Sequence, residues 1–175
     1  GVISANGRYI FFDSLATNLD PQDTNQYQDI FRHDRITGIT ELVSISIQGV
    51  ANFGSSEVES SADGRYVAFM SLASSLVPGD TNNVMDIFRK DMATGEVIRV
   101  SESSKGDEGN DDSKWVSISG DGQRLLFESE ATTLVDGDTN GVVDVFSAEI
   151  ATTPFPTATP TATATPPGTA TPSAT

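Results

Sequence analysis

The sequence predicts an all-β fold of three β-propeller-like repeats, in which each repeat is a blade of four short antiparallel strands. Three observations lead to this prediction. The segment at residues 4–9 recurs at 61–66 and again at 119–124, with nearly constant spacing. Each copy carries Asn-Gly or Asp-Gly, the strongest short-range signal for a β-hairpin, beside runs rich in β-branched and aromatic residues. No segment shows helical periodicity.

The strands can be placed in order within a repeat. In the second repeat a first strand at residues 58–61 leads into Asp-Gly, where we expect a hairpin turn with positive φ at both central residues. A second strand follows at residues 65–71, and a third covers residues 86–91. A turn ending in Thr-Gly then leads to a fourth strand at residues 96–101, with its counterpart at 40–46.

Aromatic residues recur on these strands, and their recurrence predicts a packed core. The recurring phenylalanines are Phe11, Phe69 and Phe127 on the second strands and Phe31, Phe88 and Phe146 on the third strands. Trp115 stands where the second repeat has Glu57, so it does not belong to the repeated core. It is a candidate platform for a sugar or a contact between blades.

Between its second and third strands each repeat has the pattern Asp-Thr-Asn-x-x-x-Asp, which places three oxygen-bearing side chains in a short loop. Calcium prefers hard oxygen ligands of this kind. The later ligands of a complete calcium loop are missing, so two interpretations stay open. Either each loop binds one weakly held calcium ion, or its Asp and Asn cap the loop by accepting backbone N–H bonds. The candidate metal ligands are Asp23, Asn25, Asp29, Asp80, Asn82, Asp86, Asp138, Asn140 and Asp144.

These motifs resemble those of a known family. The pattern S-x-D-G-R-Y-V-A-F-x-S, followed by D-I-F-x-x-D-x-x-T-G and x-V-S, is similar to the TolB-like β-propeller repeats of bacterial envelope and secreted proteins. The resemblance covers about residues 1–151, with repeats at about 1–50, 51–108 and 109–151. It implies the propeller fold but no single activity, because propellers host many functions.

The two end repeats depart from the pattern. The first begins inside its first strand at Gly1, and the third keeps residues 144–150 but has no fourth strand, because the chain then meets Pro154. Three blades are fewer than the roughly four to eight of a closed propeller, and open blades expose sheet edges. Three arrangements solve this problem: a fragment of a longer propeller, a two-chain ring of six blades, or head-to-tail stacking into a filament.

Residues 152–175 form a separate tail with ten Thr and six Pro. Proline fixes φ and removes backbone donors, so we expect an extended, polyproline II-like tail or linker. Tails of this composition are O-glycosylated stalks in secreted proteins. The candidate glycosylation sites are Thr157, Thr159, Thr161, Thr163, Thr165, Thr169 and Thr171.

Composition excludes several classes of partner. The chain has 25 acidic and 10 basic residues and a net charge of −15, which argues against nucleic acid because phosphates need basic partners. It has no cysteine, and no apolar run is long enough to insert into a membrane. The single histidine, His33, has Lys90 as its repeat counterpart, which suggests an exposed position. No catalytic Ser/His/Asp set is evident, so we expect no enzyme.

Together these features predict a non-enzymatic structural or adhesion protein at an extracellular or cell-surface location. Its blades would assemble between copies of itself, as an oligomer or filament, and its tail would carry O-linked glycans. The alternative is a carbohydrate- or peptide-binding propeller lobe of a longer secreted protein, assisted by calcium, the one cofactor that the loops suggest. A non-catalytic fragment of a propeller hydrolase is a third interpretation.

Overall fold

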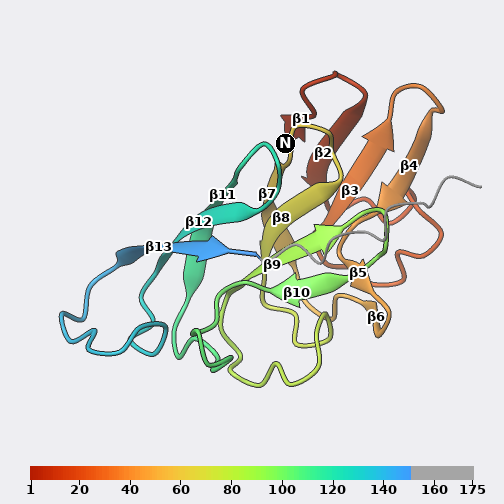
Figure 1. The fold of residues 1–175 in the computed structure, drawn as a ribbon. Coiled ribbons are helices and arrows are strands. Elements are labelled where there is room, and N and C mark those ends of the chain that lie inside the picture. The colour runs from red at the N-terminus through yellow and green to blue at the C-terminus, as the bar shows by residue number, and fades with distance from the viewer. Residues whose placement is uncertain (151–175) are drawn as a thin grey trace, which may run out of the picture.

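The computed structural model describes residues 1–150, which form three antiparallel sheets and one small hairpin (Figure 1). The first sheet has the spatial order β1 (Val2–Ile3), β2 (Tyr9–Ser14), β3 (Asp29–Asp34), β4 (Ile39–Leu42). The second has the order β7 (Ser55–Ser60), β8 (Tyr66–Ser71), β9 (Asp86–Asp91), β10 (Val97–Arg99). The third has the order β11 (Ser113–Ile118), β12 (Arg124–Ser129), β13 (Asp144–Glu149). The hairpin pairs β5 (Ile45–Ser46) with β6 (Gly49–Val50).

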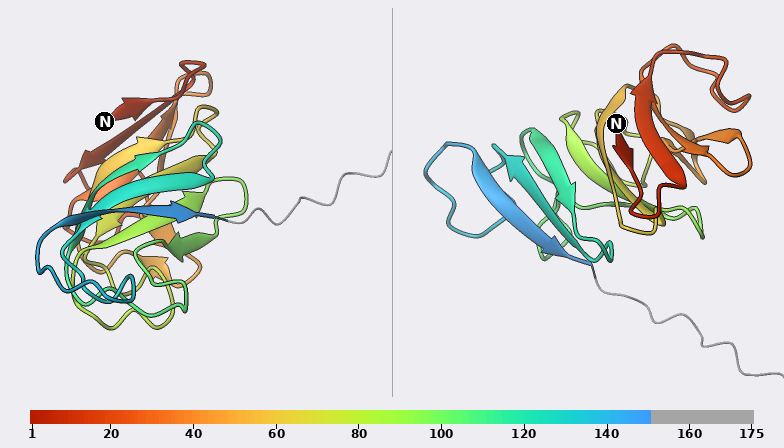
Figure 2. Two further views of the ribbon diagram at one scale, coloured as in Figure 1. Left: turned by 60° about the vertical axis from the view of Figure 1, so that its left-hand side comes forward. Right: turned by 90° about the horizontal axis from the view of Figure 1, so that it is seen from above.

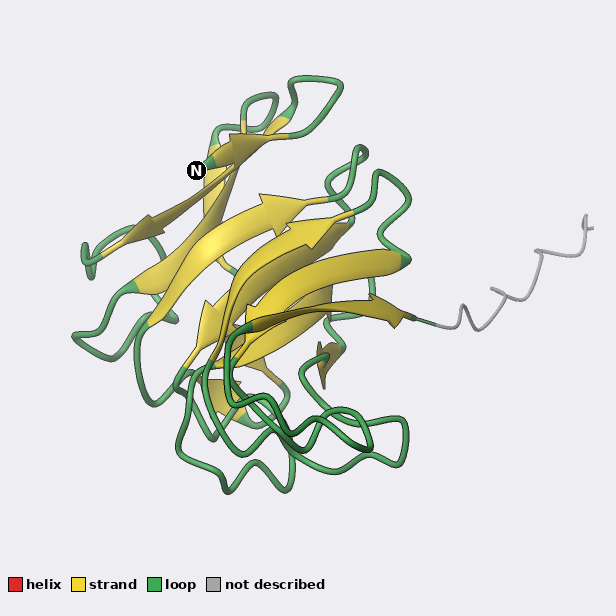
Figure 3. Cartoon of the chain, turned by 90° about the vertical axis from the view of Figure 1, so that its left-hand side faces the viewer, coloured by secondary structure: helices red, strands yellow, loops and turns green. Residues whose placement is uncertain are grey.

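The described residues contain strands and loops but no helix (Figure 3). The predicted all-β fold with antiparallel blades of four strands is therefore confirmed, and within residues 1–150 the third blade has three strands. The predicted polyproline II-like tail and its candidate glycosylation sites lie outside the described residues. No helix in residues 1–150 is long and apolar enough to cross a membrane.

The three blades lie side by side in sequence order, an arrangement that we call the fan (Figure 2). Strand β7 of the second blade lies against the first blade, and β11 of the third blade lies against the second. The first strands of successive blades also contact one another, because β7 touches both β1 and β11. The blades therefore converge at their first strands, which is the arrangement of a sector of a propeller.

Two hydrophobic clusters hold the blades together, one at each junction. The first includes Phe11 and Ile30 from the first blade and Phe69 from the second, all fully buried. The second places Ile87 of the second blade against Leu125 of the third. The second blade buries one surface on the first blade and the other on the third, so most of the core lies between sheets.

The Asp-Gly turns differ from the expected geometry. In the second blade Gly64 has a φ of 73°, but Asp63 does not have a positive φ, so the expectation of two such residues is wrong. The Gly64 N–H donates to the Ser61 carbonyl at 3.0 Å, and Asp63 accepts from Ser61 Oγ at 2.6 Å and from the Arg65 N–H at 3.0 Å. The acidic side chain thus holds the turn by local hydrogen bonds, which removes the need for a second left-handed residue.

Two first strands contain a β-bulge that the sequence did not reveal. The register of β7 on β8 shifts between Ser56 and Glu59, and the same shift occurs in β11. Glu57 and Trp115 occupy the two bulges, with φ values of 53° and 56°. Trp115 is 61% exposed, which confirms that it stands outside the core.

The aromatic repeat needs one correction. In the first blade Phe12, rather than Phe11, pairs with Phe31 across β2 and β3. Their ring centroids lie 5.9 Å apart, matching 6.0 Å for Phe69 with Phe88 in the second blade. Adjacent strand residues point to opposite faces, so the shift of one residue places Phe11 on the face toward the second blade.

The fourth strand of the first blade is shorter than predicted. It ends at Leu42 rather than near residue 46, because the chain turns away at residues 43 and 44. Residues 45 and 46 then pair with β6 in the separate hairpin. β-branched residues alone could not distinguish a continued strand from a new hairpin at this place.

Candidate functional site

In each acidic loop the asparagine side chain donates a hydrogen bond to the aspartate that begins the third strand. The asparagine oxygen accepts the backbone N–H two residues further along the chain. These are the hydrogen bonds of the capping interpretation. The three donor–acceptor distances are 2.8 Å for Asn25 to Asp29, 2.9 Å for Asn82 to Asp86 and 2.9 Å for Asn140 to Asp144.

The loop also joins one blade to the next. In the second blade the Ser101 hydroxyl donates to Asp86 and accepts the Ile87 N–H at 3.0 Å. Asn82 Nδ2 donates to the Gly109 carbonyl at 3.0 Å, on the segment that enters the third blade. The first blade makes the same bonds one repeat earlier. The repetition of the motif is thus explained by its role as a structural joint.

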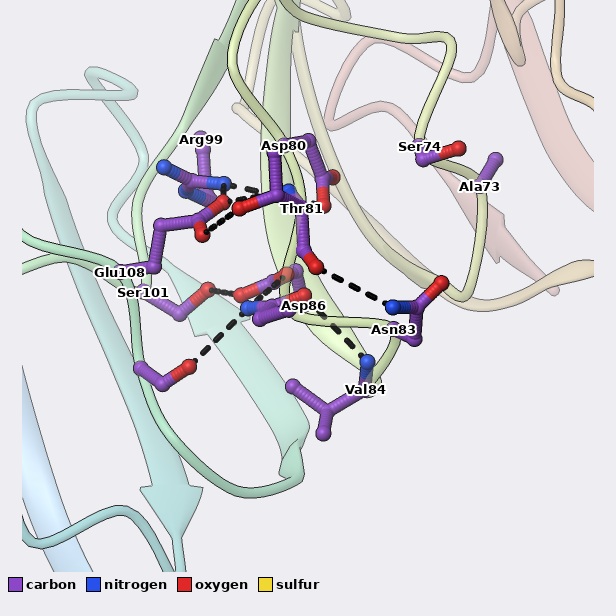
Figure 4. Close-up of polar contacts among 12 residues, drawn as sticks. Ala73, Ser74, Asp80, Thr81, Asn83, Val84, Asp86, Arg99, Ser101 and Glu108 are labelled. Atoms are coloured by element: carbon purple, nitrogen blue, oxygen red, sulfur yellow. Dashed lines mark hydrogen bonds and ion pairs between the residues drawn. The ribbon is translucent and has the colours of Figure 1, made fainter.

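In the second blade a guanidinium lies among three carboxylates at this joint (Figure 4). Arg99 Nη1 lies 2.6 Å from Glu108 Oε1 and 3.8 Å from Asp80 Oδ1, and its side chain is only 7% exposed. Burial and the neighbouring Asp86 raise the pKa of Asp80 to about 6. Glu108 also accepts hydrogen bonds from the Thr81 N–H and hydroxyl. Arg99 therefore supplies the positive charge that a bound cation would otherwise supply here.

The other two blades do not share this guanidinium. Leu42 holds the position of Arg99 in the first blade, where Asp23 and Asp29 are buried and burial raises the pKa of Asp29. In the third blade Asp144 is half-buried rather than buried. Residues 1–150 contain no group of three or more His, Cys, Asp or Glu side chains arranged to hold a metal ion. Calcium binding at the nine candidate ligands stays a prediction.

A buried lysine ties the second blade to the first. Lys90 Nζ donates to the carbonyls of Val43 and Ile45 at 2.9 and 2.7 Å, and burial lowers its pKa to about 8. Because Lys90 is buried, the inference that its counterpart His33 occupies an exposed position is wrong. His33 is half-buried, with Nδ1 3.0 Å from Thr40 Oγ1. Nothing in the sequence around Lys90 indicated this contact between blades, which we call the Lys90 clamp.

The surface of the third blade that faces away from the second, which we call the open surface, carries apolar side chains in solvent. Leu126 is 50% exposed and Val145 is 70% exposed. Their counterparts in the second blade, Ala68 and Ile87, are completely buried under the third blade. The repeat places apolar residues at these positions in the third blade too, although the described chain has no blade to cover them.

The opposite end of the fan carries the complementary surface, which we call the leading surface of the first blade. It consists of Ile10 and Phe12, with the fully buried Phe31 beneath them, and these three are the counterparts of residues through which the second blade packs on the first. Phe12 and Ile10 are half-buried, whereas Phe69 and Val67 at the matching positions are fully buried. Each end of the molecule therefore presents half of a blade junction.

A series of backbone hydrogen bonds runs from turn to turn across the blades in one direction. The Ala5 N–H donates to the Ala62 carbonyl at 2.8 Å, and the Ala62 N–H donates to the Gly120 carbonyl at 2.8 Å. The next donor in this series is the Gly120 N–H on the third blade. The next acceptor is the Ala5 carbonyl on the first blade. The two ends of the molecule thus have opposite hydrogen-bonding character.

The contact between a tyrosine and a glycine at each blade junction has no counterpart on the open surface of the third blade. Tyr9 lies against Gly64 and Tyr66 lies against Gly122, so closely that a Cβ at either glycine would clash with the ring. The third blade has Arg124 at this position, with a side chain that is 70% exposed. A blade packed on the open surface would therefore meet a charged side chain where the two internal junctions have a tyrosine.

Comparisons with known proteins support the fold. No protein-family model matches the sequence, and no curated protein matches it. Among solved structures, a putative TolB from Agrobacterium tumefaciens matches 84% of this chain and 43% of its own, with 19% identity and a TM-score of 0.51. TolB from Acinetobacter baumannii matches 83% and 31%, with 17% identity and a TM-score of 0.48. The tricorn protease matches 83% and 12%, with 14% identity and a TM-score of 0.45.

The chain is thus built of β-propeller blades. In fold these blades are similar to those of the Agrobacterium TolB, as the sequence motifs indicated. The chain spans less than half the length of either TolB protein.

Proposed function

We propose that this protein is a non-enzymatic structural or adhesion protein of the cell surface or extracellular space, whose copies associate blade to blade. The observation that carries the proposal is the exposure of Leu126 and Val145, at positions that the internal junction buries completely. Exposed apolar surface that matches a buried junction elsewhere in the same molecule favours association with a surface of the same kind.

The leading surface of a second copy provides such a partner. It offers Phe12 and Ile10 to the open surface, as Phe69 and Val67 are offered inside the molecule. In the same arrangement the Gly120 N–H of one copy would reach the Ala5 carbonyl of the next. The association is heterologous, so it closes into a ring of two copies with six blades or continues as a filament.

The expected result is an assembly larger than the monomer in native mass spectrometry and in negative-stain images of the full chain. Leu126→Lys places a charge on the open surface, and we expect it to weaken association by at least about tenfold. The matched control is Ile47→Lys in the turn between β5 and β6, where the side chain is 97% exposed. A monomer at all concentrations, or equal weakening by both variants, would contradict the proposal.

O-glycosylation of the tail belongs to the same proposal. The support for it is the Thr- and Pro-rich composition of residues 152–175. The intact mass of the natural protein is expected to exceed the sequence mass by multiples of a hexose. A mass equal to that of the bare chain would remove the glycosylated tail from the proposal.

A second candidate function is a calcium-assisted carbohydrate- or peptide-binding lobe of a longer secreted protein. The observation that favours it is Trp115, which is 61% exposed and held at a φ of 56° in the β11 bulge. An exposed indole on a rigid strand is a platform for a sugar ring or an apolar side chain. Glycan-array binding that Trp115→Ala abolishes would favour this candidate, while absence of binding would remove it.

A further inference from the structure

A groove lies beside β13, between the third blade and the outer strand of the second. Its volume is about 580 Å³. One side is formed by Ile98 of β10 and the segment that follows it, and the other by Phe127, Phe146 and Ile150 of the third blade. Apolar side chains thus line both sides of the groove, together with polar and charged residues such as Lys105 and Asp136.

The groove borders an unpaired strand edge. Within residues 1–150, β13 pairs only with β12, whereas β9 at the same position in the second blade also pairs with β10. The Asp91 N–H donates to Glu96 across that outer edge, and Arg89 pairs with Ile98. In the register of the repeat, Ser147 and Glu149 are the counterparts of Arg89 and Asp91. Their N–H groups therefore point toward the groove.

We propose that residues 154–158 of this same chain form the fourth strand of the third blade, with the Phe155 side chain in the groove. The register that relates the second and third blades places Phe155 at the position of Val97 in β10. The chain leaves β13 at Ile150, which itself lines the groove, so only a short turn is needed to reach it.

The surroundings of Val97 show why a large apolar side chain suits this place. Val97 packs on a cluster that contains Leu76 and Phe88, with Met92 beside it. The counterparts of these three residues are Leu134, Phe146 and Ile150, and all three line the groove. Phe155 is the single aromatic residue in the 152–175 segment, and the repeat places it where these neighbours converge.

Of the two prolines that argued against a fourth strand, Pro154 costs little in this register and Pro156 costs one ladder hydrogen bond. Pro154 stands at the position of Glu96, whose own N–H donates to Thr94 Oγ1 rather than to β9. Pro156 stands at the position of Ile98 and removes one hydrogen bond of the ladder. Proline is tolerated on an edge strand where its missing N–H would face solvent, whereas Pro156 in this register faces β13, so the strand is held there by fewer hydrogen bonds than β10. The strand would therefore depend chiefly on Phe155.

Hydrogen exchange of the full chain tests this proposal. In the natural protein the Ser147 and Glu149 amides are expected to be protected, and Phe155→Ser is expected to speed their exchange by at least about tenfold. The matched control is Ala164→Ser, which lies beyond the proposed strand and should leave both amides unchanged. Equal exchange in the natural protein and in Phe155→Ser would overturn the proposal.

Cross-linking shows whether the segment in the groove belongs to the same chain or to a neighbouring copy. The chain has no natural cysteine, so Val135→Cys on the groove can be combined with Thr157→Cys, which leaves Phe155 in place, and treated with a short thiol cross-linker. A cross-link within one chain, at a concentration where the protein is dilute, is the expected product. A cross-link only between chains, or only the pair Val135→Cys with Ala164→Cys reacting, would overturn the proposal. Neither result depends on whether copies associate through Leu126.

Discussion

At the scale of single residues, Arg99 explains how the second blade tolerates several buried carboxylates. Its guanidinium lies between Glu108 and Asp80, while Asp86 is satisfied by hydroxyl and amide donors. The compensation is incomplete, because burial and Asp86 still raise the pKa of Asp80 to about 6. Asp80 is thus a group whose charge opposes folding at neutral pH.

The pH dependence of stability provides a test for Asp80. A carboxyl with a folded pKa near 6, above its ordinary 3.8, stabilises the fold below about pH 4, and this contribution is lost as the pH rises through 6. Asp80→Asn removes that titration. Between pH 4 and pH 7 the variant is therefore expected to gain roughly 1–3 kcal/mol of unfolding free energy relative to the natural protein.

Urea denaturation at several pH values gives the measurement for this prediction. The control is Asp136→Asn, because the Asp136 side chain is 91% exposed and should not alter the pH dependence. If the natural protein and Asp80→Asn showed the same change in stability between pH 4 and pH 7, the assigned role of Asp80 would be wrong.

At the scale of strands and loops, the repeat made most of the fold predictable. Asp-Gly turns and alternating strands located the blades, since those signals are local. The Lys90 clamp and the burial of Arg99 were not predictable, because they depend on contacts with residues distant in the sequence. The bulges at Glu57 and Trp115 carried no local sequence signal. The open surface could have been predicted from the sequence, because Leu126 and Val145 are apolar residues at repeat positions whose counterparts in the second blade are buried.

The structure restricts the calcium prediction to two of the three acidic loops. Because Arg99 already supplies a cation in the second blade, calcium binding is expected at the loops of the first and third blades. Saturating calcium should then raise the melting temperature, since a ligand at about 100 times its dissociation constant adds about 2.7 kcal/mol per site. Asp23→Asn should reduce this increase, whereas Asp80→Asn should preserve it.

Thermal melts in calcium and in chelator measure the effect. Identical melts under both conditions would leave the loops with capping as their one role, as their hydrogen bonds already indicate.

At the scale of the whole molecule, the fan has two unlike ends and a net charge of −15. Copies that approach end to end repel one another through this charge, although the surfaces that meet are partly apolar. Salt screens the repulsion over about a Debye length while leaving apolar burial intact. We therefore expect association to strengthen as the salt concentration rises.

Light scattering between about 0.02 and 0.3 M sodium chloride measures this dependence. Association that weakened with salt would indicate that ion pairs, rather than apolar contacts, hold the copies together. The exposed Arg124 on the open surface is the residue through which such ion pairs would form.

The turn-to-turn hydrogen bonds have a consequence for growth. Since every donor in the series faces the same way, from Ala5 through Ala62 toward Gly120, a row of copies would be directional, with one donor tip and one acceptor tip. A copy altered only at Leu126 would still join an existing row through its first blade. It would then leave a tip that binds the next copy at least about tenfold more weakly. A small proportion of such copies, mixed with natural protein, would act as terminators and shorten every row.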